Sequence, residues 1–259
     1  SGFPYVMLSH ANSEHLWPDD VRGQKVLDLY RHARRSYFVS ESNRRLLESQ
    51  LGAELTNAES GRNQFNVRRD AAPPWPAAET ISLACVARLD PSAKGQDILL
   101  KVLAREIWRS RPVKVSLYGK GRSEQSLLRL TEHLGLQETV RFAGHTDNIE
   151  NAWATHHALV LQSRYEGLPL SIVEAMHCGR PAIVTDVAGN AELLKDGVTG
   201  FIAEAATEEH LHRAMDRAWQ KRADWLQIGA AAAQSVRQLV PADPLGVFTQ
   251  KLLDAARQD

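Results

Sequence analysis

Two glutamates, Glu166 and Glu174, stand eight positions apart in the segment that runs from Ser163 to Met176. Pro169 suits the first turn of a helix, where its missing N–H costs nothing. Glu166 is therefore expected in the loop before a helix and Glu174 inside it, with unpaired helix N–H groups between them. At about 1.5 Å per residue, Pro169 and Glu174 would lie on the order of 8 Å apart along the axis. Two carboxylates so placed can bracket a ligand with hydroxyls at both ends and negative charge in its middle, which is the shape of a nucleotide sugar.

The competing interpretation makes Glu166 a helix cap and Glu174 a surface residue. Glu174 stands between Val173 and Ala175 in an apolar run, where burying an idle carboxylate would be costly. Spacing alone leaves both interpretations open.

Two cations follow an earlier expected strand, in the segment Arg88-Leu-Asp-Pro-Ser-Ala-Lys94-Gly95. A helix that begins near Gly95 would add free N–H groups and the positive end of its dipole. Together they predict an anion site, although two solvated surface cations remain the alternative.

Gly119 and Gly121 flank Lys120 after the next expected strand. Glycine permits positive φ and the close approach of a ligand to the backbone, but a lone pair of this kind also marks an ordinary turn. The segment lacks the third glycine of the dinucleotide fingerprint, so NAD binding is disfavoured.

These residues need a scaffold, and the pattern from residue 80 onward predicts strands that alternate with helices. Strands are expected at Ile81–Ala87, Val113–Tyr118, Thr139–Phe142, Ala158–Leu161, Ala182–Val184 and Gly200–Ile202. Helices are expected at Gly95–Ile107, Ser123–Leu134, Ile149–Ala154, Pro169–His177, Ala188–Leu194 and Glu208–Gln220, and two more at Asp224–Leu239 and Pro244–Ala256. The fold class is therefore α/β, a doubly wound parallel sheet of the Rossmann type that binds ligands beyond the carboxyl ends of its strands.

The first 70 residues repeat the alternation on a smaller scale. They predict strands at Tyr5–Leu8, Tyr37–Val39 and Arg62–Val67, a helix at Val21–Ala33, and a second helix that is capped by Ser40 or Ser42 and ends before Gly52. Three prolines between Asp70 and Glu79 predict a linker.

Composition excludes several classes of function. The 259 residues carry no net charge, which disfavours partners held by bulk charge such as nucleic acid, and no apolar run suggests a membrane span. Cys85 and Cys178 stand in apolar segments and are expected to be buried thiols, with no metal-ligand spacing around them. The arginines between Arg31 and Arg45 form a local basic cluster that leaves peripheral membrane association open.

The order of the motifs resembles the C-terminal half of the retaining glycosyltransferases of family 4, which have the two-domain GT-B fold. The resemblance covers roughly residues 80 to 220. It rests on six segments: Arg88 to Gly95, Gly119 to Gly121, Val140 to Gly144, Ser163 to Met176, Gly179 to Pro181, and Gly189 to Gly200.

The resemblance implies a role for each matching residue. Arg88 and Lys94 would grip the donor diphosphate, Glu174 would accept hydrogen bonds from ribose hydroxyls, and Glu166 would contact the transferred sugar. Further donor contacts are implied for the residues of the glycine loop, the segment that borders the base and the start of the helix: Gly119, Gly121, His145, Gly167, Leu168, Leu170 and Ser171. His10, at the end of the first strand, would contact the sugar from across the cleft.

The sequence therefore predicts four parts. They are the end of an N-terminal acceptor-side domain (1–70), a linker (71–79), a nucleotide-sugar domain (80–222), and helices that cross back toward the N-terminal part (223–259). More than 100 residues that the resemblance expects before Tyr5 are missing from the sequence, so the chain is expected to be a piece of the fold.

The implied activity is hexose transfer from a nucleoside diphosphate sugar to the hydroxyl of a glycan or lipid-linked acceptor, without a metal or other cofactor. A cytoplasmic site of action is expected, at the inner face of the membrane if the protein associates with one. A nucleotide-sugar epimerase and a non-catalytic sugar-nucleotide-binding half remain alternatives.

Overall fold

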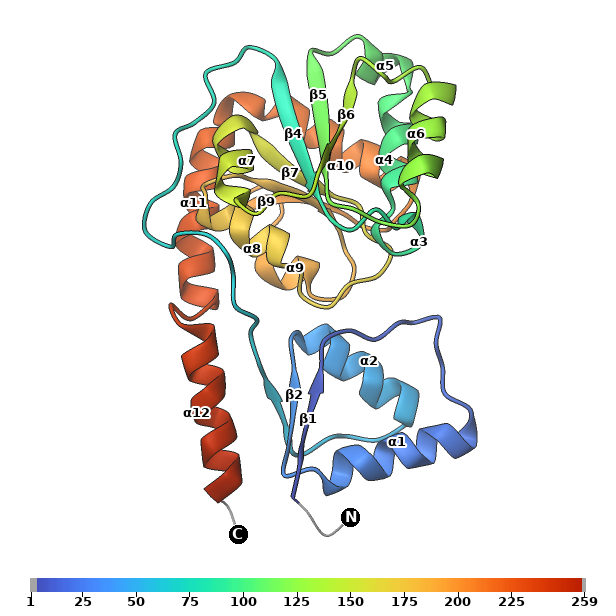
Figure 1. Ribbon diagram of the computed structural model, residues 1–259, viewed down its shortest axis with the longest axis vertical. Helices are drawn as coiled ribbons and strands as arrows, with labels where there is room; N and C mark the ends of the chain where they lie inside the picture. Colours follow the sequence, from blue (N-terminus) through green and yellow to red (C-terminus); the bar gives the residue numbers. More distant parts are fainter. Residues whose placement is uncertain (1–3, 258–259) are drawn as a thin grey trace.

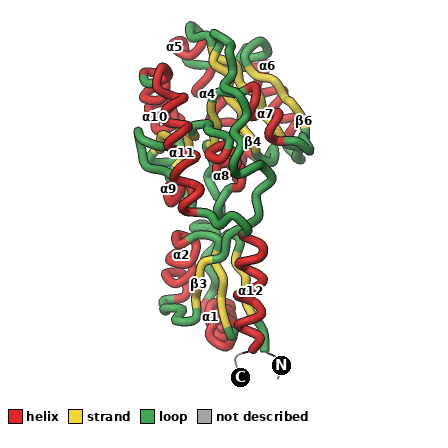
Figure 2. Tube along the Cα trace, turned by 90° about the vertical axis from the view of Figure 1, so that its left-hand side faces the viewer, coloured by secondary structure: helices red, strands yellow, loops and turns green. Residues whose placement is uncertain are grey.

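The computed structural model describes residues 4–257, which build an elongated molecule with a larger and a smaller α/β unit (Figure 1). The larger unit contains a six-stranded sheet and the smaller one a three-stranded sheet. The N-terminal segment and the last helix both lie in the smaller unit. In the view turned by 90°, the two units follow one another along the long axis (Figure 2).

The six-stranded sheet is parallel throughout and has the order β6-β5-β4-β7-β8-β9. Its strands are β4 (Ile81–Val86), β5 (Val113–Tyr118), β6 (Val140–Gly144), β7 (Ala158–Leu161), β8 (Ala182–Thr185) and β9 (Gly200–Ala203). The chain order reverses between β4 and β7, and this is the point at which such sheets bind ligands. The expected doubly wound fold is confirmed.

Helices cover both faces of this sheet. Successive side chains of a strand point to opposite faces, and here apolar side chains on both faces need to be buried. One face packs on α4 (Gln96–Leu103), α6 (Glu124–His133) and α10 (Glu208–Gln220), and the other on α7 (Ile149–Thr155), α8 (Leu170–His177) and α11 (Trp225–Leu239). In β4, Leu83 and Cys85 join the first core whereas Ala84 joins the second. Short helices α3 (Pro91–Lys94), α5 (Glu106–Arg109) and α9 (Asn190–Leu193) complete the connections, and a 3-10 turn (222–224) leads into α11.

The smaller unit is a parallel sheet of β1 (Val6–Ser9), β2 (Arg35–Phe38) and β3 (Ala58–Ser60), with α1 (Asp20–His32) and α2 (Glu41–Leu51). Ser40 caps α2, since its hydroxyl accepts a hydrogen bond from the N–H of Asn43 at 3.2 Å. Gly52 ends that helix in the left-handed conformation with φ of 61°.

The last helix, α12 (Pro244–Arg257), leaves the larger unit and lies along the smaller one (Figure 1). Phe248 packs edge-on against Tyr37 with ring centroids 5.1 Å apart. Arg34 donates hydrogen bonds to the Ala255 and Ala256 carbonyls at 3.0 and 2.9 Å. The helix therefore packs against the smaller unit beside β2.

Two predicted elements are wrong. Residues 62–67 form no strand with any described residue, because Phe65 and Val67 bury their side chains against the α8 face of the larger unit instead of in a ladder. The expected helix Gly95–Ile107 is two short helices, α4 and α5, with a break between Leu103 and Glu106. Gly95, with its left-handed φ of 63°, separates α4 from the preceding short helix α3.

The basic cluster is largely neutralised by its own neighbours. Arg44 and Arg45 pair with Glu41, Arg35 pairs with Glu59 at 3.0 Å, and Arg34 is committed to α12. The cluster therefore gives no support to membrane association. No helix within residues 4–257 has the length and apolar character to cross a bilayer.

Both cysteines are buried free thiols, as predicted. Burial raises the pKa of Cys85 to about 11 and that of Cys178 to about 12, so neither is a thiolate at neutral pH.

Candidate functional site

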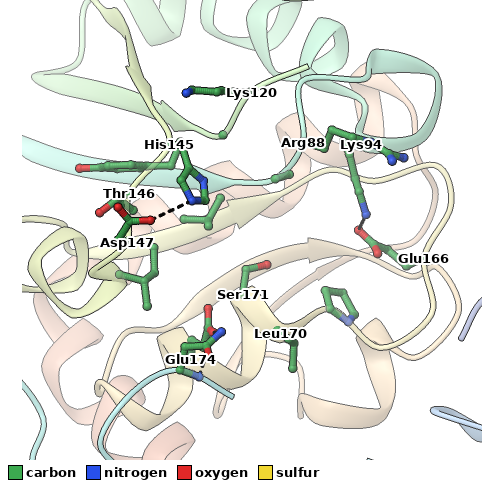
Figure 3. A pocket seen from close by; sticks show the side chains of 17 residues that line it. Arg88, Lys94, Lys120, His145, Thr146, Asp147, Glu166, Leu170, Ser171 and Glu174 are labelled. Carbon is green, nitrogen blue, oxygen red and sulfur yellow. Dashed lines mark hydrogen bonds and ion pairs between the residues drawn. The ribbon is translucent and has the colours of Figure 1, made fainter. Parts of the chain in front are cut away.

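A cleft of about 810 Å³ opens at the carboxyl ends of β4, β5, β6 and β7, where the strand order reverses (Figure 3). We call it the switch-point cleft. It is lined by Asn66, Val86, Ala87, Arg88, Lys94, Tyr118, Gly119, Lys120, His145, Thr146, Asp147, Ile149, Glu166, Pro169, Leu170, Ser171 and Glu174. The structure thus brings eight of the twelve predicted site residues together in one place.

Lys94 and Glu166 form an ion pair at one end of this cleft. The Lys94 ammonium donates to Glu166 Oε1 at 2.5 Å, and the Ser163 hydroxyl donates to the same oxygen at 2.7 Å. Both charged side chains are largely buried, with 19% and 7% of their surface exposed. A buried ion pair with an additional hydrogen bond has a fixed geometry. The Lys94 and Glu166 charges are therefore held in fixed positions relative to a bound ligand.

Gly95 lets the two loops that carry this pair meet. A side chain at Gly95 would collide with the carbonyl of Gln162, at the end of β7. The Gln162 amide in turn donates to the Lys94 carbonyl at 2.8 Å, and the N–H groups of Arg164 and Tyr165 donate to the Ala93 carbonyl. Hydrogen bonds therefore lock the loop after β4 to the loop after β7.

Arg88 and Lys120 add two more cations to the cleft wall. The Arg88 side chain is 66% exposed, and among the ion pairs of the described residues it contacts only the Asp90 carboxylate, at 3.5 Å. Lys120 lies on the side of the cleft opposite α8 (Figure 3). Three cations and the first N–H groups of α8 thus surround one volume and favour an anion there.

Gly119 and Gly121, in the loop after β5, allow this loop to pack closely against the backbone of the loop after β4. Side chains at Gly119 and Gly121 would collide with the carbonyls of Ala87 and Leu89, in the neighbouring loop. Gly119 lines the cleft at φ of 133°, whereas Gly121 is not among the lining residues. The position of Gly121 therefore does not support its predicted role as a donor contact.

The start of α8 forms the floor of the cleft. Pro169 is its N-cap residue, and Leu170 and Ser171 line the cleft after it. Gly167 and Leu168, which were predicted as donor contacts, lie outside the lining. Leu168 is buried in the core, and a side chain at Gly167 would collide with the His10 carbonyl.

His10 follows β1 and belongs to the same contact between the units. Its carbonyl lies against Gly167, but its exposed imidazole is not among the lining residues of the switch-point cleft. The structure therefore places the His10 backbone beside the loop of Glu166, and its ring outside the lining of the switch-point cleft.

Glu174 lies at the other end of the cleft and is 5% exposed. The backbone N–H and the side-chain amide of Asn66 both donate to its Oε1, at 3.2 and 3.3 Å. Burial raises the pKa of Glu174 to about 6, and the two Asn66 bonds oppose that rise. The alternative of a surface glutamate is excluded, as is a capping role for Glu166, since no side chain of the described residues caps α8.

The loop after β6 forms the remaining wall with His145, Thr146 and Asp147. The His145 Nε2 lies 3.3 Å from Asp147 Oδ1, and both side chains are exposed at the rim. The sequence pattern predicts His145 as a site residue but not Thr146 or Asp147, although their place directly after a strand is a usable signal. Asn66 was also missed as a site residue, because it comes from the other side of the linker.

A second cavity, of about 640 Å³, lies between the two units. It is lined by Asn12, His15 and Asn43 on one side, and by Tyr165, Glu166 and Asp186 on the other, among others. Glu166 lines both cavities. We call this second space the interface cavity. Within the described residues, no group of three His, Cys, Asp or Glu side chains is arranged to hold a metal ion.

The chain is similar to known glycosyltransferases over its larger unit. It is 32% identical over 115 residues to N-acetyl-alpha-D-glucosaminyl L-malate synthase of Bacillus anthracis, covering 39% of this chain and 30% of that protein. It is 28% identical over 120 residues to poly(ribitol-phosphate) alpha-N-acetylglucosaminyltransferase of Staphylococcus aureus, covering 46% of this chain and 24% of that protein. The matches thus span less than a third of either relative's length.

Solved structures share the arrangement of both units. TarM of S. aureus, in a complex that contains UDP, matches 98% of this chain and 51% of its own with a TM-score of 0.81 at 19% identity. HepE of Anabaena, in complex with UDP-glucose, matches 98% of this chain and 72% of its own with a TM-score of 0.80 at 22% identity. At such identities the likeness shows the fold, which is of the GT-B type.

The family model described as glycosyl transferases group 1 matches residues 80–221, which include β4 to β9 and all of the switch-point cleft except Asn66. This chain therefore belongs to the group 1 glycosyl transferases.

Proposed function

We propose that this chain forms the donor-binding part of a retaining glycosyltransferase, which transfers a hexose from a nucleoside diphosphate sugar to an acceptor hydroxyl without a metal ion. The observation that carries the proposal is the switch-point cleft. The buried Lys94–Glu166 pair lies at one end of this cleft and the buried Glu174 at the other, with the start of α8 between them.

The proposed donor lies along the cleft floor. Its ribose hydroxyls meet Glu174, and its base lies toward the loop of His145. The diphosphate lies at the start of α8, where Arg88 and Lys94 supply positive charge, and the hexose reaches Glu166. This order follows the placement of charges, because hydroxyls prefer carboxylate acceptors and a diphosphate prefers cations and helix N–H groups.

Catalysis in this proposal is electrostatic. The bond between the anomeric carbon and the diphosphate oxygen breaks, and the acceptor oxygen forms its bond to that carbon on the same face. The acceptor proton passes to the departing diphosphate. Arg88, Lys94 and the α8 dipole stabilise the negative charge as it develops, and this supports a reaction that needs no metal.

The interface cavity supports transfer over epimerisation. A transferase needs room for an acceptor beside the donor sugar, and the interface cavity meets the switch-point cleft at Glu166. An epimerase has no use for such a second space. We propose that the acceptor, a glycan or a lipid-linked sugar, enters from this side.

Calorimetric titration with UDP, GDP and ADP in the presence of a chelator tests the proposal. At least one nucleotide should bind, and Lys94→Ala should weaken its binding by about tenfold to a hundredfold through loss of a charge-assisted contact. Lys101→Ala is the matched control, because Lys101 is exposed on α4 outside the cleft. The proposal fails if none of the three nucleotides binds, or if both lysine variants bind as the parent does.

A further inference from the structure

Residues 65–69 cross the larger unit without regular secondary structure, and we call this segment the strap. Phe65 and Val67 are buried in the core of the α8 face. Asn66, between them, lines the switch-point cleft, and Arg68 is exposed. The alternation of apolar and polar residues that predicts a strand at 62–67 thus reflects the burial of Phe65 and Val67 against the larger unit.

Phe65, Arg68 and Arg69 each anchor the strap to a helix. The Phe65 ring packs against the His177 ring of α8 with centroids 4.5 Å apart. Arg68 Nε donates to Glu150 of α7 at 3.0 Å. Arg69 and Arg237 of α11 each donate a guanidinium hydrogen bond to the other's carbonyl, at 2.5 and 2.9 Å. Three helices therefore fix the backbone on both sides of Asn66.

Asn66 directs both of its donors at one oxygen of Glu174. The backbone N–H and the side-chain amide reach Oε1, whereas Oε2 accepts no hydrogen bond from the described residues. A carboxylate held through one oxygen keeps its other oxygen in a defined direction, ready for a ligand's hydroxyl groups.

We propose that Asn66 is the positioning residue of the ribose subsite: by bonding Oε1 alone, it keeps Glu174 ionised at neutral pH and leaves Oε2 to accept hydrogen bonds from the ribose hydroxyls. This inference rests on the proposed function. It also means that the donor site extends beyond residues 80–221, the part that matches the family model, into the connection from the smaller unit.

Charges on several elements face the same cleft and bear on its pH dependence. The charged or titratable groups that line the cleft include Arg88, Lys94, Lys120, His145, Asp147 and Glu166. Outside the lining, Glu150 lies on α7, and His177 and Cys178 are buried at the end of α8. Glu150 is paired with Arg68, Glu166 with Lys94, and Asp147 contacts His145. Burial and the Asn66 bonds are what shift the pKa of Glu174, so a change at Asn66 should act on it directly.

The first test follows the Glu174 carboxyl signal by NMR across pH in ligand-free protein labelled at the glutamate carboxyl carbon, assigned with Glu174→Gln. The parent should titrate near pH 6. Asn66→Ala should titrate about one unit higher, because a hydrogen bond to the charged form is lost. Asn66→Asp, which places a second carboxylate there, should shift further. Gln64→Ala, a neighbouring exposed amide outside the cleft, is the matched control and should titrate as the parent.

The second test measures binding of UDP-, GDP- and ADP-glucose between pH 5 and 8, since the diphosphate of these diesters does not titrate there. The tightest ligand should bind Asn66→Ala about fivefold more weakly than the parent at pH 6 and within about twofold at pH 8, as the ionised fraction dictates. Loosening of the strap alone would weaken binding equally at every pH.

An unchanged Glu174 titration in Asn66→Ala, or a loss of affinity that does not depend on pH, overturns the positioning role while the proposed function stands. A parent that binds none of the three sugar nucleotides overturns the proposed function, and the ribose role of Asn66 with it, whatever the NMR midpoint.

Discussion

The two carboxylates of the switch-point cleft differ in what compensates their burial. Glu166 has the Lys94 ammonium at 2.5 Å, whereas Glu174 has two amide donors from Asn66 and no cation among the described residues within ion-pair distance. A buried carboxylate without a cation is held at a free-energy cost, which its raised pKa records. Such a cost is common where a charge serves a ligand instead of the fold.

Glu174→Gln should therefore stabilise the protein and impair its binding. A folded-state pKa of about 6, above the ordinary carboxyl value, means that stability from this group is lost as pH rises through 6. The amide avoids that loss, so its unfolding free energy should exceed the parent's by roughly 1–2 kcal/mol at pH 8. Urea denaturation at pH 8 and pH 5 measures this, and the gain should shrink at pH 5. A less stable variant at pH 8 would contradict the account.

At the scale of elements, one side of α8 runs from the cleft into the core. Ser171 and Glu174 line the cleft, and His177, one turn later, is fully buried beside Phe65 of the strap. Neither ring nitrogen of His177 has a hydrogen-bond partner among the described residues. Burial, with the charges of Arg237 and Arg69, lowers its pKa to about 4.

His177→Leu should reduce the loss of stability in acid. Because the folded state holds this imidazole neutral, its contribution is complete above pH 6.5 and is lost as pH falls toward 4. The parent should lose about 1–3 kcal/mol more than the variant between pH 7 and pH 4.5. Unfolding free energies at the two pH values measure the difference. Equal losses in the two proteins would show that His177 is not held neutral.

The sequence was sufficient for most elements because apolar periodicity reports burial directly. It found the six strands of the larger unit, the helix that carries Glu174, and the Lys94 loop. It failed at residues 62–67, because alternation states which side chains are buried but not whether a ladder or a helix face buries them. Asn66 was beyond reach for the same reason: its partner Glu174 lies 108 positions along the chain.

At the scale of the molecule, three contacts fix the smaller unit beside the donor loops. The strap carries Asn66, the His10 carbonyl packs on Gly167, and the Glu192 carboxylate accepts from the N–H groups of Glu41 and Ser42 at 3.2 and 2.7 Å. Glu192, which lies on α9 of the larger unit, thus satisfies two unpaired N–H groups at the start of α2 and complements the positive end of its dipole. The cavity between the units depends on these contacts.

Glu192→Ala should loosen this junction. Loss of a carboxylate at the start of a helix should cost about 1 kcal/mol, and hydrogen exchange at the Ser42 amide should quicken. Glu192→Gln keeps an acceptor oxygen and should retain most of the protection. Exchange measured by NMR or mass spectrometry distinguishes the three proteins. An amide equally protected in Glu192→Ala would mean that another group holds α2.

The central claim is that the switch-point cleft binds the nucleoside diphosphate of a donor sugar without a metal ion. A crystal structure with UDP, GDP or ADP, grown in chelator, tests it most directly. The account predicts ribose hydroxyls against Glu174 and the diphosphate between the start of α8, Arg88 and Lys94. A nucleotide bound elsewhere, or one that enters the cleft only when Mg²⁺ is added, would contradict it.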